Sequence, residues 1–418
     1  MDRLSNEKIV QILTDRIRNE GVDFFNEMET FLQEEMNLPK KTSKILSQKI
    51  LEEFKEKAFP PVTRIEMFIT ENCPLRCDYC FVEGKNDFKR MSKETARKAV
   101  DFLIHQSAEK KDLNIIFFGG EPLLEFELMK EVIKYANCKA ESAGKRITYD
   151  LTTNGVLIRE EHLVFFQREG IKFLLSIDGD SETHNKHRKT AHGKGSYGTI
   201  IDKFPMMKKY QPWMGAKMTV HPDTAHKLLH NVRHLAEIGF NQFIIGAASG
   251  VDWKEDDWMT YETQMHEVAK LYREMRRNKK YFRMTLFEEE EDKFFNKRYV
   301  WGCQAGRHSL TISTDGSIYP CSKMLGLNEL EGICRLGHID TGITDIIMRG
   351  KLLGMGRVDR TKCSKCELLD CCKGGCFATN YLETKDIFKP STFDCKTSAI
   401  QARVIINHLK SEKEKKWK

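Results

Sequence analysis

Long apolar runs are missing from this chain of 418 residues, although 40% of its residues are hydrophobic. No stretch approaches the roughly 20 apolar residues that a membrane-spanning helix needs. The N-terminus, MDRLSNEKIV, also lacks the apolar core of a signal peptide. We therefore expect a protein of the cytoplasm that has no membrane as a partner.

A nucleic-acid reader motif is missing too. The formal net charge of +7 is small beside 68 basic and 61 acidic residues, and no basic run is interleaved with aromatic residues. We therefore expect no nucleic-acid partner. Dominant disorder is excluded by 25 phenylalanines and many isoleucines and leucines, so the chain is expected to fold around a sizeable core.

Cysteine, in contrast, is abundant and unevenly placed. Of thirteen cysteines, three lie between 73 and 80, one is Cys138, and nine lie between 303 and 395. Thiols stay reduced in the cytoplasm, where clustered cysteines more often bind metal or take part in chemistry than form disulfides. Cys138 falls in the middle of an expected helix and is predicted to be an ordinary packed thiol.

The hydrophobic pattern predicts an α/β fold after a helical N-terminal extension at 1–62. After that extension, short β-branched runs alternate with amphipathic stretches. This alternation indicates successive βα units and a parallel sheet, in either a partial barrel or a doubly wound arrangement. In both arrangements ligands collect at the carboxyl ends of the strands. The expected strands are 64–70, 113–118, 147–152, 171–177, 216–220 and 242–246.

Two further regions follow the βα units of 63–255. Residues 256–300 are charged and helical in pattern and are expected to form a solvated linker. Residues 301–418 combine cysteines with Gly and Asp turns, which indicates a separate region whose fold depends on metal ligation. Residues 1–62 could serve in peptide recognition.

The loop after the first expected strand reads Cys73-Pro-Leu-Arg-Cys77-Asp-Tyr-Cys80. Three thiolates on one short loop can hold three corners of a [4Fe–4S] cluster and leave the fourth iron without a protein ligand. A structural zinc site would instead need a fourth Cys or His nearby, and none follows. The open iron could chelate a small molecule through amino and carboxylate groups.

Together with three further motifs, this loop resembles the radical S-adenosylmethionine (SAM) enzymes. Gly119-Gly120-Glu121-Pro122 follows the second strand, Thr153-Asn154-Gly155 the third, and Ser176-Ile-Asp178-Gly179 the fourth. The resemblance implies a partial (β/α)6 barrel, a SAM-bound cluster on Cys73, Cys77 and Cys80, and hydrogen abstraction by a 5′-deoxyadenosyl radical. The same resemblance implies the SAM contacts. Tyr79 would lie beside the adenine, the Gly119, Gly120 and Glu121 motif would receive the amino group, and Arg188 would bind the carboxylate. Asn154 and Ser176 would be further contacts, and the backbone near Ala247 would supply an apolar contact.

The C-terminal cysteines resemble a second pattern, the seven-cysteine SPASM motif of radical SAM enzymes that modify peptides and proteins. The spacing is Cys303-x12-Gly316-x4-Cys321, then Cys363-x2-Cys366-x5-Cys372-x3-Cys376, and last Cys395. The resemblance implies two auxiliary [4Fe–4S] clusters, three clusters in all. The outer one would be held by Cys363, Cys366, Cys372 and Cys395, and the inner one by Cys303, Cys321 and Cys376.

The inner set lacks a fourth cysteine just upstream, which the sulfatase-maturing relatives possess. Either the inner cluster has an open iron where a substrate thiolate can dock, or Cys334 or Cys371 closes it. Those relatives also carry an aspartate directly after the second motif cysteine, whereas Ser322 and Lys323 stand here. This departure disfavours formylglycine formation.

The combined pattern predicts a maturase that forms thioether crosslinks in a Cys-containing precursor peptide, like the sactipeptide and ranthipeptide maturases. Its electron donor would be of the flavodoxin or ferredoxin type. Carbon–carbon crosslinking, epimerisation and sulfatase maturation remain alternatives within the same family. A zinc-stapled binding module without catalysis is the alternative from another class.

Overall fold

The structure is a computed structural model that describes residues 12–13, 16–17, 20–83, 88–278, 281–288, 303–354, 363–368, 372 and 374–416. Six parallel strands form its centre in the order in which they occur along the chain. All six coincide with expected strands to within a residue or two. They are β1 (Arg64–Thr70), β2 (Asp112–Gly119), β3 (Arg146–Thr153), β4 (Lys172–Ser176), β5 (Gly215–Val220) and β6 (Gln242–Ala247).

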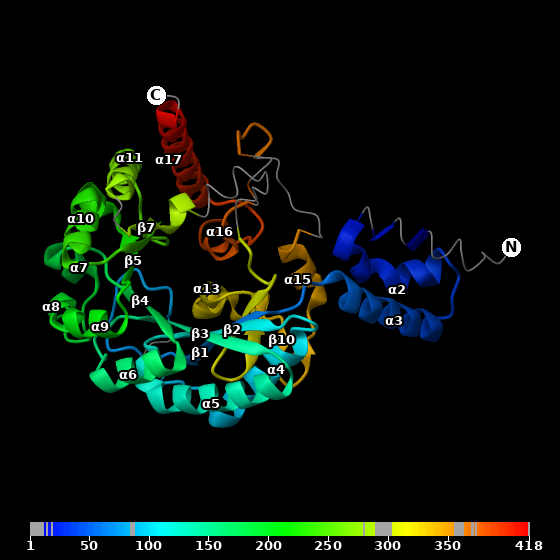
Figure 1. The fold of residues 1–418 in the computed structure, drawn as a ribbon. Coiled ribbons are helices and arrows are strands. Elements are labelled where there is room, and N and C mark those ends of the chain that lie inside the picture. Colours follow the sequence, from blue (N-terminus) through cyan, green and yellow to red (C-terminus); the bar gives the residue numbers. More distant parts are fainter. Residues whose placement is uncertain are drawn as a thin grey trace.

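Helices connect these strands and cover the outer face of the curved sheet (Figure 1). In α4, for example, Ser92 accepts a hydrogen bond from Thr95 N at the N-terminus, and Ala96, Val100 and Leu103 are buried on one face. The covering elements are α4 (Lys93–Gln106), η2 (Pro122–Glu125), α5 (Phe126–Ser142), α6 (Glu160–Glu169), α7 (Ser181–His187), α8 (Tyr197–Ile201), α9 (Phe204–Tyr210), η3 (Pro222–Lys227) and α10 (Leu228–Ile238). The partial barrel predicted from the sequence is therefore confirmed.

The sheet continues beyond the barrel on both edges. Short β7 (Arg283–Met284) pairs with β6, and β8 (Ser309–Ile312) pairs in parallel with β1. Antiparallel strands β9 (Ser317–Tyr319), β10 (Gly337–His338) and β11 (Gly342–Ile343) extend that second edge. Cysteine density after residue 301 indicated a separate region, but shared backbone hydrogen bonds join its first part to the barrel.

The segment expected to be a solvated linker packs against the molecule instead. Its first part is α11 (Glu255–Arg277), where Trp258, Tyr261, Met265 and Val268 are buried at three- and four-residue spacing. This face lies against η3, α10 and the C-terminal helix α17 (Thr392–Lys416). The prediction of a solvated segment was wrong for α11, because the many charged residues on its other face dominate the composition and obscure this narrow apolar stripe.

The two helices expected at the N-terminus are present and project from the barrel (Figure 1). After the 3-10 turn η1 (Gly21–Asp23), α2 (Phe24–Glu34) and α3 (Lys40–Ala58) pack around a small core of their own that includes Phe24, Met28 and Leu32. The pair is joined to the C-terminal region, where Lys351 Nζ lies 2.5 Å from Asp23 Oδ1.

The remaining described helices lie in the C-terminal region. They are α13 (Ser322–Gly326), η4 (Asn328–Leu330), α14 (Glu331–Cys334), α15 (Ile346–Leu352) and α16 (Phe377–Thr384). Among the described helices, none is long and apolar enough to cross a bilayer.

Candidate functional site

The loop after β1 brings its three cysteines to one cavity of about 240 Å³ at the carboxyl ends of the strands. Cys73 Sγ accepts hydrogen bonds from Leu75 N at 3.5 Å and Asn154 Nδ2 at 3.6 Å. Burial raises the pKa of Cys73 to about 12. A thiolate is therefore unfavourable here without a cationic partner. A thiol-rich loop with this property fits an iron–sulfur cluster.

Two glycines let the β2 loop pass directly beneath the cysteine loop. A Cβ on Gly119, whose φ is +132°, would lie 2.1 Å from Thr70 O, and a Cβ on Gly120 would lie 2.1 Å from Asn72 O. The backbones are hydrogen bonded at this crossing, Gly120 N to Thr70 O and Glu121 N to Asn72 O, both at 2.8 Å. Both glycines line the cavity. The motif is thus required for close approach as well as for exposing backbone to a ligand.

Glu121, expected among the SAM contacts, is fully buried and is not among the residues that line this cavity. Its carboxylate accepts hydrogen bonds from Leu123 N, Thr153 Oγ1 and Asn154 N at 2.8 to 3.1 Å. Burial raises the pKa of Glu121 to about 7, although these bonds act in the opposite direction. Glu121 therefore connects the β2 and β3 loops and positions Asn154 at the cavity.

Arg188 lines the cavity but is already paired with a buried carboxylate. Its Nε and one terminal nitrogen donate to Asp178 at 2.8 and 3.0 Å, and its guanidinium lies 5.3 Å from the Tyr79 ring centre. Tyr79 also donates to Asp178. Burial alone would raise the pKa of Asp178, but the charge and hydrogen bonds of Arg188 hold it below its usual value. Asp178 therefore partly neutralises the positive charge that Arg188 presents to the cavity.

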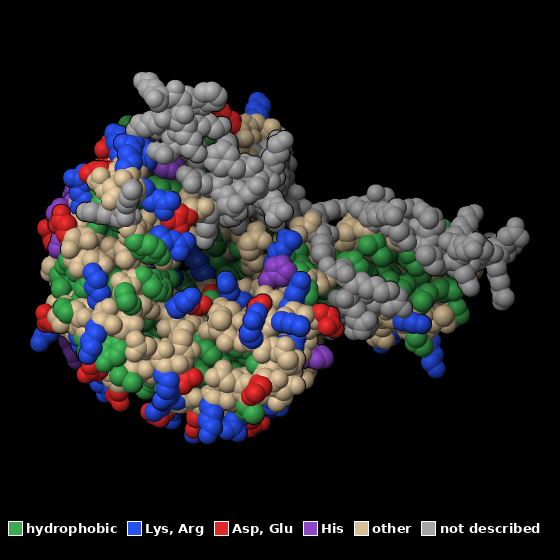
Figure 2. Space-filling view, viewed as in Figure 1, with side chains coloured by type: hydrophobic (Ala, Val, Ile, Leu, Met, Phe, Trp, Pro, Cys, Tyr) green, Lys and Arg blue, Asp and Glu red, His purple; other side chains and the backbone are tan. Residues whose placement is uncertain are grey.

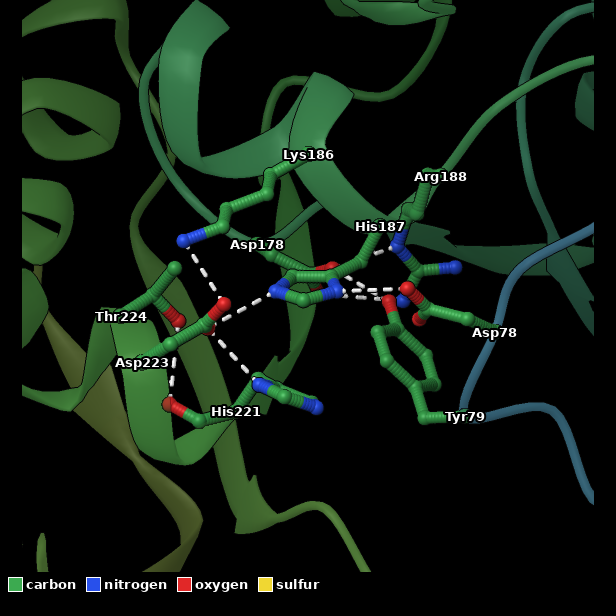
Figure 3. A network of polar contacts seen from close by, with 9 residues as sticks. All are labelled: Asp78, Tyr79, Asp178, Lys186, His187, Arg188, His221, Asp223 and Thr224. Carbon is green, nitrogen blue, oxygen red and sulfur yellow. Dashed lines mark hydrogen bonds and ion pairs between the residues drawn. The ribbon is translucent and has the colours of Figure 1, made fainter. Parts of the chain in front are cut away.

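Sequence reasoning missed a polar network beside this pair (Figure 3). His187 Nδ1 lies 2.8 Å from Asp78 Oδ2, and its Nε2 lies 3.0 Å from Asp223 Oδ1. Asp223 also contacts His221 and Lys186 at 2.7 Å each, and these contacts help to lower the pKa of Asp223 to about 2 despite its partial burial. The network ties the cysteine loop to the loops after β4 and β5.

His187, His221 and Asp223 offer one ligand atom each within 4.8 Å of one another. The sequence does not reveal this grouping, because Asp223 is more than thirty residues from His187 along the chain. Hydrogen bonds to Lys186 and the two histidines already account for the contacts of Asp223, so the group acts as a polar clamp.

The C-terminal thiols lie in two groups with the membership that the SPASM resemblance implies. Burial raises the pKa of Cys303 to about 11, with nearby Cys376 contributing. Removal from water, followed by the charges of Cys303 and Cys376, raises the pKa of half-buried Cys321. A second cavity, of about 280 Å³, is lined by Cys363, Cys366, Cys372 and Cys395. The structure thus brings together three thiols in one group and four in the other, as a pair of ligand sets would require.

The remaining cysteines are placed apart. Cys334 is fully buried in the main core, and burial together with Asp345 raises its pKa to about 12. Cys371 lies outside the described residues. Cys138 is exposed, so the prediction of a packed thiol was wrong. It lies between Ala136 and Ala140 on α5, on the face opposite to these two buried residues.

The other expected contacts meet at the main cavity, because Tyr79, Asn154, Ser176 and Ala247 all line it. Sequence reasoning did not single out Lys217 of β5 as a lining residue, and it noted Lys323 of α13 only as a departure from the relatives. Lys217 could have been found from the alternation of β5, which turns it inward beside its strand partner Ser176.

Comparison with known proteins decides the family of this barrel. Residues 67–235 match the radical SAM superfamily. The chain carries a radical SAM domain. The match spans β1 to the middle of α10, which includes the cysteine loop and the motifs after β2, β3 and β4.

Relatives of this chain match more residues than the radical SAM domain contains. An uncharacterized protein of Methanocaldococcus jannaschii is 28% identical over 273 residues, 65% of this chain and 87% of that protein. A cysteine-type anaerobic sulfatase-maturating enzyme of Clostridium perfringens is 25% identical over 353 residues, 76% of this chain and 89% of that enzyme. The resemblance to radical SAM maturases is therefore confirmed.

Solved structures share the fold of the radical SAM chain. The enzyme anSMEcpe with bound AdoMet, which is SAM, superposes with a TM-score of 0.70 at 20% identity and covers 84% of this chain and 98% of its own. Streptococcus suis SuiB bound to precursor peptide SuiA gives 0.60 at 17% identity, with 86% and 81% covered. The SPASM assignment and the count of three clusters stay predictions.

Proposed function

We propose that this radical SAM chain is a peptide maturase that joins a cysteine sulfur of a precursor peptide to a carbon of another residue. The observation that carries the proposal is the inner thiol group. Among the described residues only Cys303, Cys321 and Cys376 form it, and Lys323, two residues after Cys321, lines the same cavity as Cys73, Cys77 and Cys80. A three-thiol set leaves one cluster corner for a substrate thiolate.

The cofactor set proposed is SAM and three [4Fe–4S] clusters, with a reducing protein of the flavodoxin or ferredoxin type as electron donor. When bound, SAM and its cluster would supply a 5′-deoxyadenosyl radical that takes a hydrogen atom from the substrate. Cys73, Cys77 and Cys80 would hold that cluster. Gly119 and Gly120 would offer backbone to the SAM amino group, with Asn154, Ser176 and Ala247 lining its site.

Atoms and electrons balance in this proposal. The acceptor carbon gives a hydrogen atom to the 5′-deoxyadenosyl radical, which becomes 5′-deoxyadenosine, and the substrate thiol gives a proton. The auxiliary clusters would take up the one surplus electron. The peptide product therefore lacks two hydrogens and one free thiol. In support of a peptide substrate, one solved relative contains the Cp18Cys peptide and another the precursor peptide SuiA.

Other radical SAM reactions remain the alternatives. Carbon–carbon crosslinking also removes two hydrogens but leaves the thiol free, and epimerisation leaves the mass unchanged. Sulfatase maturation is disfavoured because Ser322 and Lys323 stand where the sulfatase-maturing pattern has an aspartate. A zinc-stapled binding module would be colourless and free of sulfide.

The test uses the anaerobically reconstituted chain, which should be brown with about twelve irons. Reduced protein should convert SAM into 5′-deoxyadenosine, and mass spectrometry of a short Cys-rich precursor encoded nearby should show loss of two hydrogens and one thiol. Cys73→Ala should remove about four irons and abolish SAM cleavage. Cys138→Ala, at an exposed thiol, is the matched control and should change neither. Zinc without sulfide, or no SAM cleavage, would refute the enzyme.

A further inference from the structure

Lys217 brings an ammonium group into the barrel without a carboxylate partner. It lies on β5 opposite Ser176 of β4, lines the main cavity, and its Nζ is 5.6 Å from the centre of the Phe118 ring. Within the described part of the chain, no ion pair or hydrogen bond of this ammonium is found. Burial lowers the pKa of Lys217, which is the cost of holding an unpaired cation there.

The carboxylate that acts on Lys217 is engaged elsewhere. Glu66 of β1 raises the pKa of Lys217 from a distance, but its Oε2 accepts hydrogen bonds from Thr311 Oγ1 at 3.0 Å and Ser322 N at 3.2 Å. These bonds hold Glu66 toward β8 and α13. The charge of Lys217 is therefore only partly compensated within the protein.

Lys323 brings a second ammonium group to the same cavity. Its Nζ donates to Ser249 Oγ at 2.5 Å and to Thr379 Oγ1 at 2.8 Å, two neutral hydroxyls. Within the described ranges Lys323 forms no ion pair. The nearby Asp394 carboxylate accepts from Cys376 N and Ser391 Oγ instead. Lys323 thus keeps a donor for a ligand beside the inner thiols.

Two cations that face one cavity, each without its own anion, favour a ligand of negative charge. Figure 2 shows that this face of the molecule is hollowed near its centre, with Lys and Arg side chains in and around the hollow. An ammonium removed from water is costly unless an anion pairs with it. A carboxylate can accept hydrogen bonds from two ammonium groups at once, one on each oxygen.

We propose that Lys217 and Lys323 together bind a carboxylate of the peptide substrate, so that an Asp or Glu side chain is held in the cavity between the Cys73 loop and the inner thiols. The inference rests on the proposed function, since it names the class of residue that the peptide presents. SAM also has a carboxylate, but Lys323 stands two residues after Cys321, on the side of the substrate thiol. The lysines would then select acidic segments.

The experiment measures binding to the reconstituted full chain with SAM present. Its probes are a blocked hexapeptide with one Cys and one Asp, and the same peptide with Asn for Asp. The wild type should bind the Asp peptide at least about tenfold more tightly, because a hydrogen bond to a charged group contributes that much. Lys217→Met and Lys323→Met should each reduce this preference, and the double variant should abolish it.

Lys172→Met is the matched control, since Lys172 lines a different cavity at the opposite end of β4. It should keep the full preference. Iron content and circular dichroism establish that each variant is folded. The affinity for SAM, measured separately by calorimetry, should stay within about twofold of the wild type in all variants.

Several outcomes would overturn the inference. Equal affinity for the two peptides would do so, as would no measurable binding of either at millimolar concentration. A loss of SAM affinity in the lysine variants with the Asp preference intact would assign the lysines to the SAM carboxylate instead. The proposed function fails separately: an Asp preference without thioether formation refutes only the reaction, whereas thioether formation without the preference refutes only the carboxylate site.

Discussion

At the scale of single residues, several charged or polar side chains of this site are buried, and hydrogen bonds or an ion pair offset the unfavourable loss of water. The Glu121 carboxylate is removed from water yet accepts three hydrogen bonds from the β2 and β3 loops. Arg188 and Asp178 are both buried and satisfied by one another. Such residues position the cavity wall, because moving either partner would leave a buried polar group unpaired.

Glu121 predicts a pH dependence of stability. Its pKa in the folded state, about 7, lies above the ordinary value of 4.5, so the folded chain binds this proton more tightly than the unfolded chain does. Glu121 therefore lowers the free energy of unfolding as the pH rises from 4.5 to 7, by about 3 kcal/mol in total. Denaturation series on wild type and Glu121→Gln should show this slope in the wild type only. An identical slope in both proteins would contradict the prediction.

Gly120 predicts a steric requirement. In Gly120→Ala the new methyl group would lie 2.1 Å from Asn72 O, immediately before Cys73, so the cysteine loop must move. We expect destabilisation of about 1 to 3 kcal/mol and a lower iron content after reconstitution. Gly198→Ala is the control, because nothing lies within 4 Å of a Cβ at that helical position. Full iron content in Gly120→Ala would refute the argument.

At the scale of elements, strand-end loops that are distant in sequence are tied together by side chains. His187 bridges Asp78, on the cysteine loop, and Asp223, after β5. Its two ring nitrogens face carboxylates on different loops, so one side chain joins both loops. The bridge lets three loops move only together, which stabilises the position of the thiols.

His187→Asn tests this bridge, because the shorter side chain cannot reach both carboxylates. Iron should leave the reconstituted protein about tenfold faster when a chelator is added, which corresponds to one lost charged hydrogen bond. His226→Asn, at an exposed histidine of η3, should lose iron at the wild-type rate. Equal rates for both variants would show that the network does not hold the loop.

At the scale of the whole molecule, the barrel and the region after residue 301 share one sheet through β1 and β8. A buried arginine strengthens this junction. Arg349 of α15 donates to Gly306 O and Pro60 O at 2.9 Å and to Arg307 O at 3.1 Å. Burial lowers the pKa of Arg349 to about 10, so it stays charged near neutral pH. It thus connects the N-terminal segment, the β8 loop and α15.

Arg349→Met should leave three carbonyl groups without their donor and cost about 3 kcal/mol of unfolding free energy. We expect an earlier unfolding transition in denaturant and faster hydrogen exchange in β8. The exposed Arg335→Met variant provides the control and should match the wild type. A shift of the same size in both variants would mean that the junction does not depend on Arg349.

The sequence by itself determined the six barrel strands and the proximity of the three thiols on the cysteine loop. The two groups of C-terminal thiols were implied only by the SPASM resemblance. Hydrophobic alternation is local, and thiols on one short loop must lie together whatever the rest of the chain does. The sequence-based predictions that α11 is solvated and that Cys138 is packed were wrong for a related reason. Composition conceals a narrow apolar stripe among charges, and the phase of a helix decides which side of α5 faces the core.

Only the tertiary structure decided which distant side chains meet. Asp178 takes up the charge of Arg188, His187 joins Asp78 to Asp223, and Lys217 and Lys323 face one cavity from β5 and α13. No local pattern encodes these pairings, because they depend on which strand ends adjoin once the sheet has curved. The motifs predicted where in the chain the cofactor residues lie, whereas the packing of the barrel determined the charge of the cavity that we propose receives the substrate.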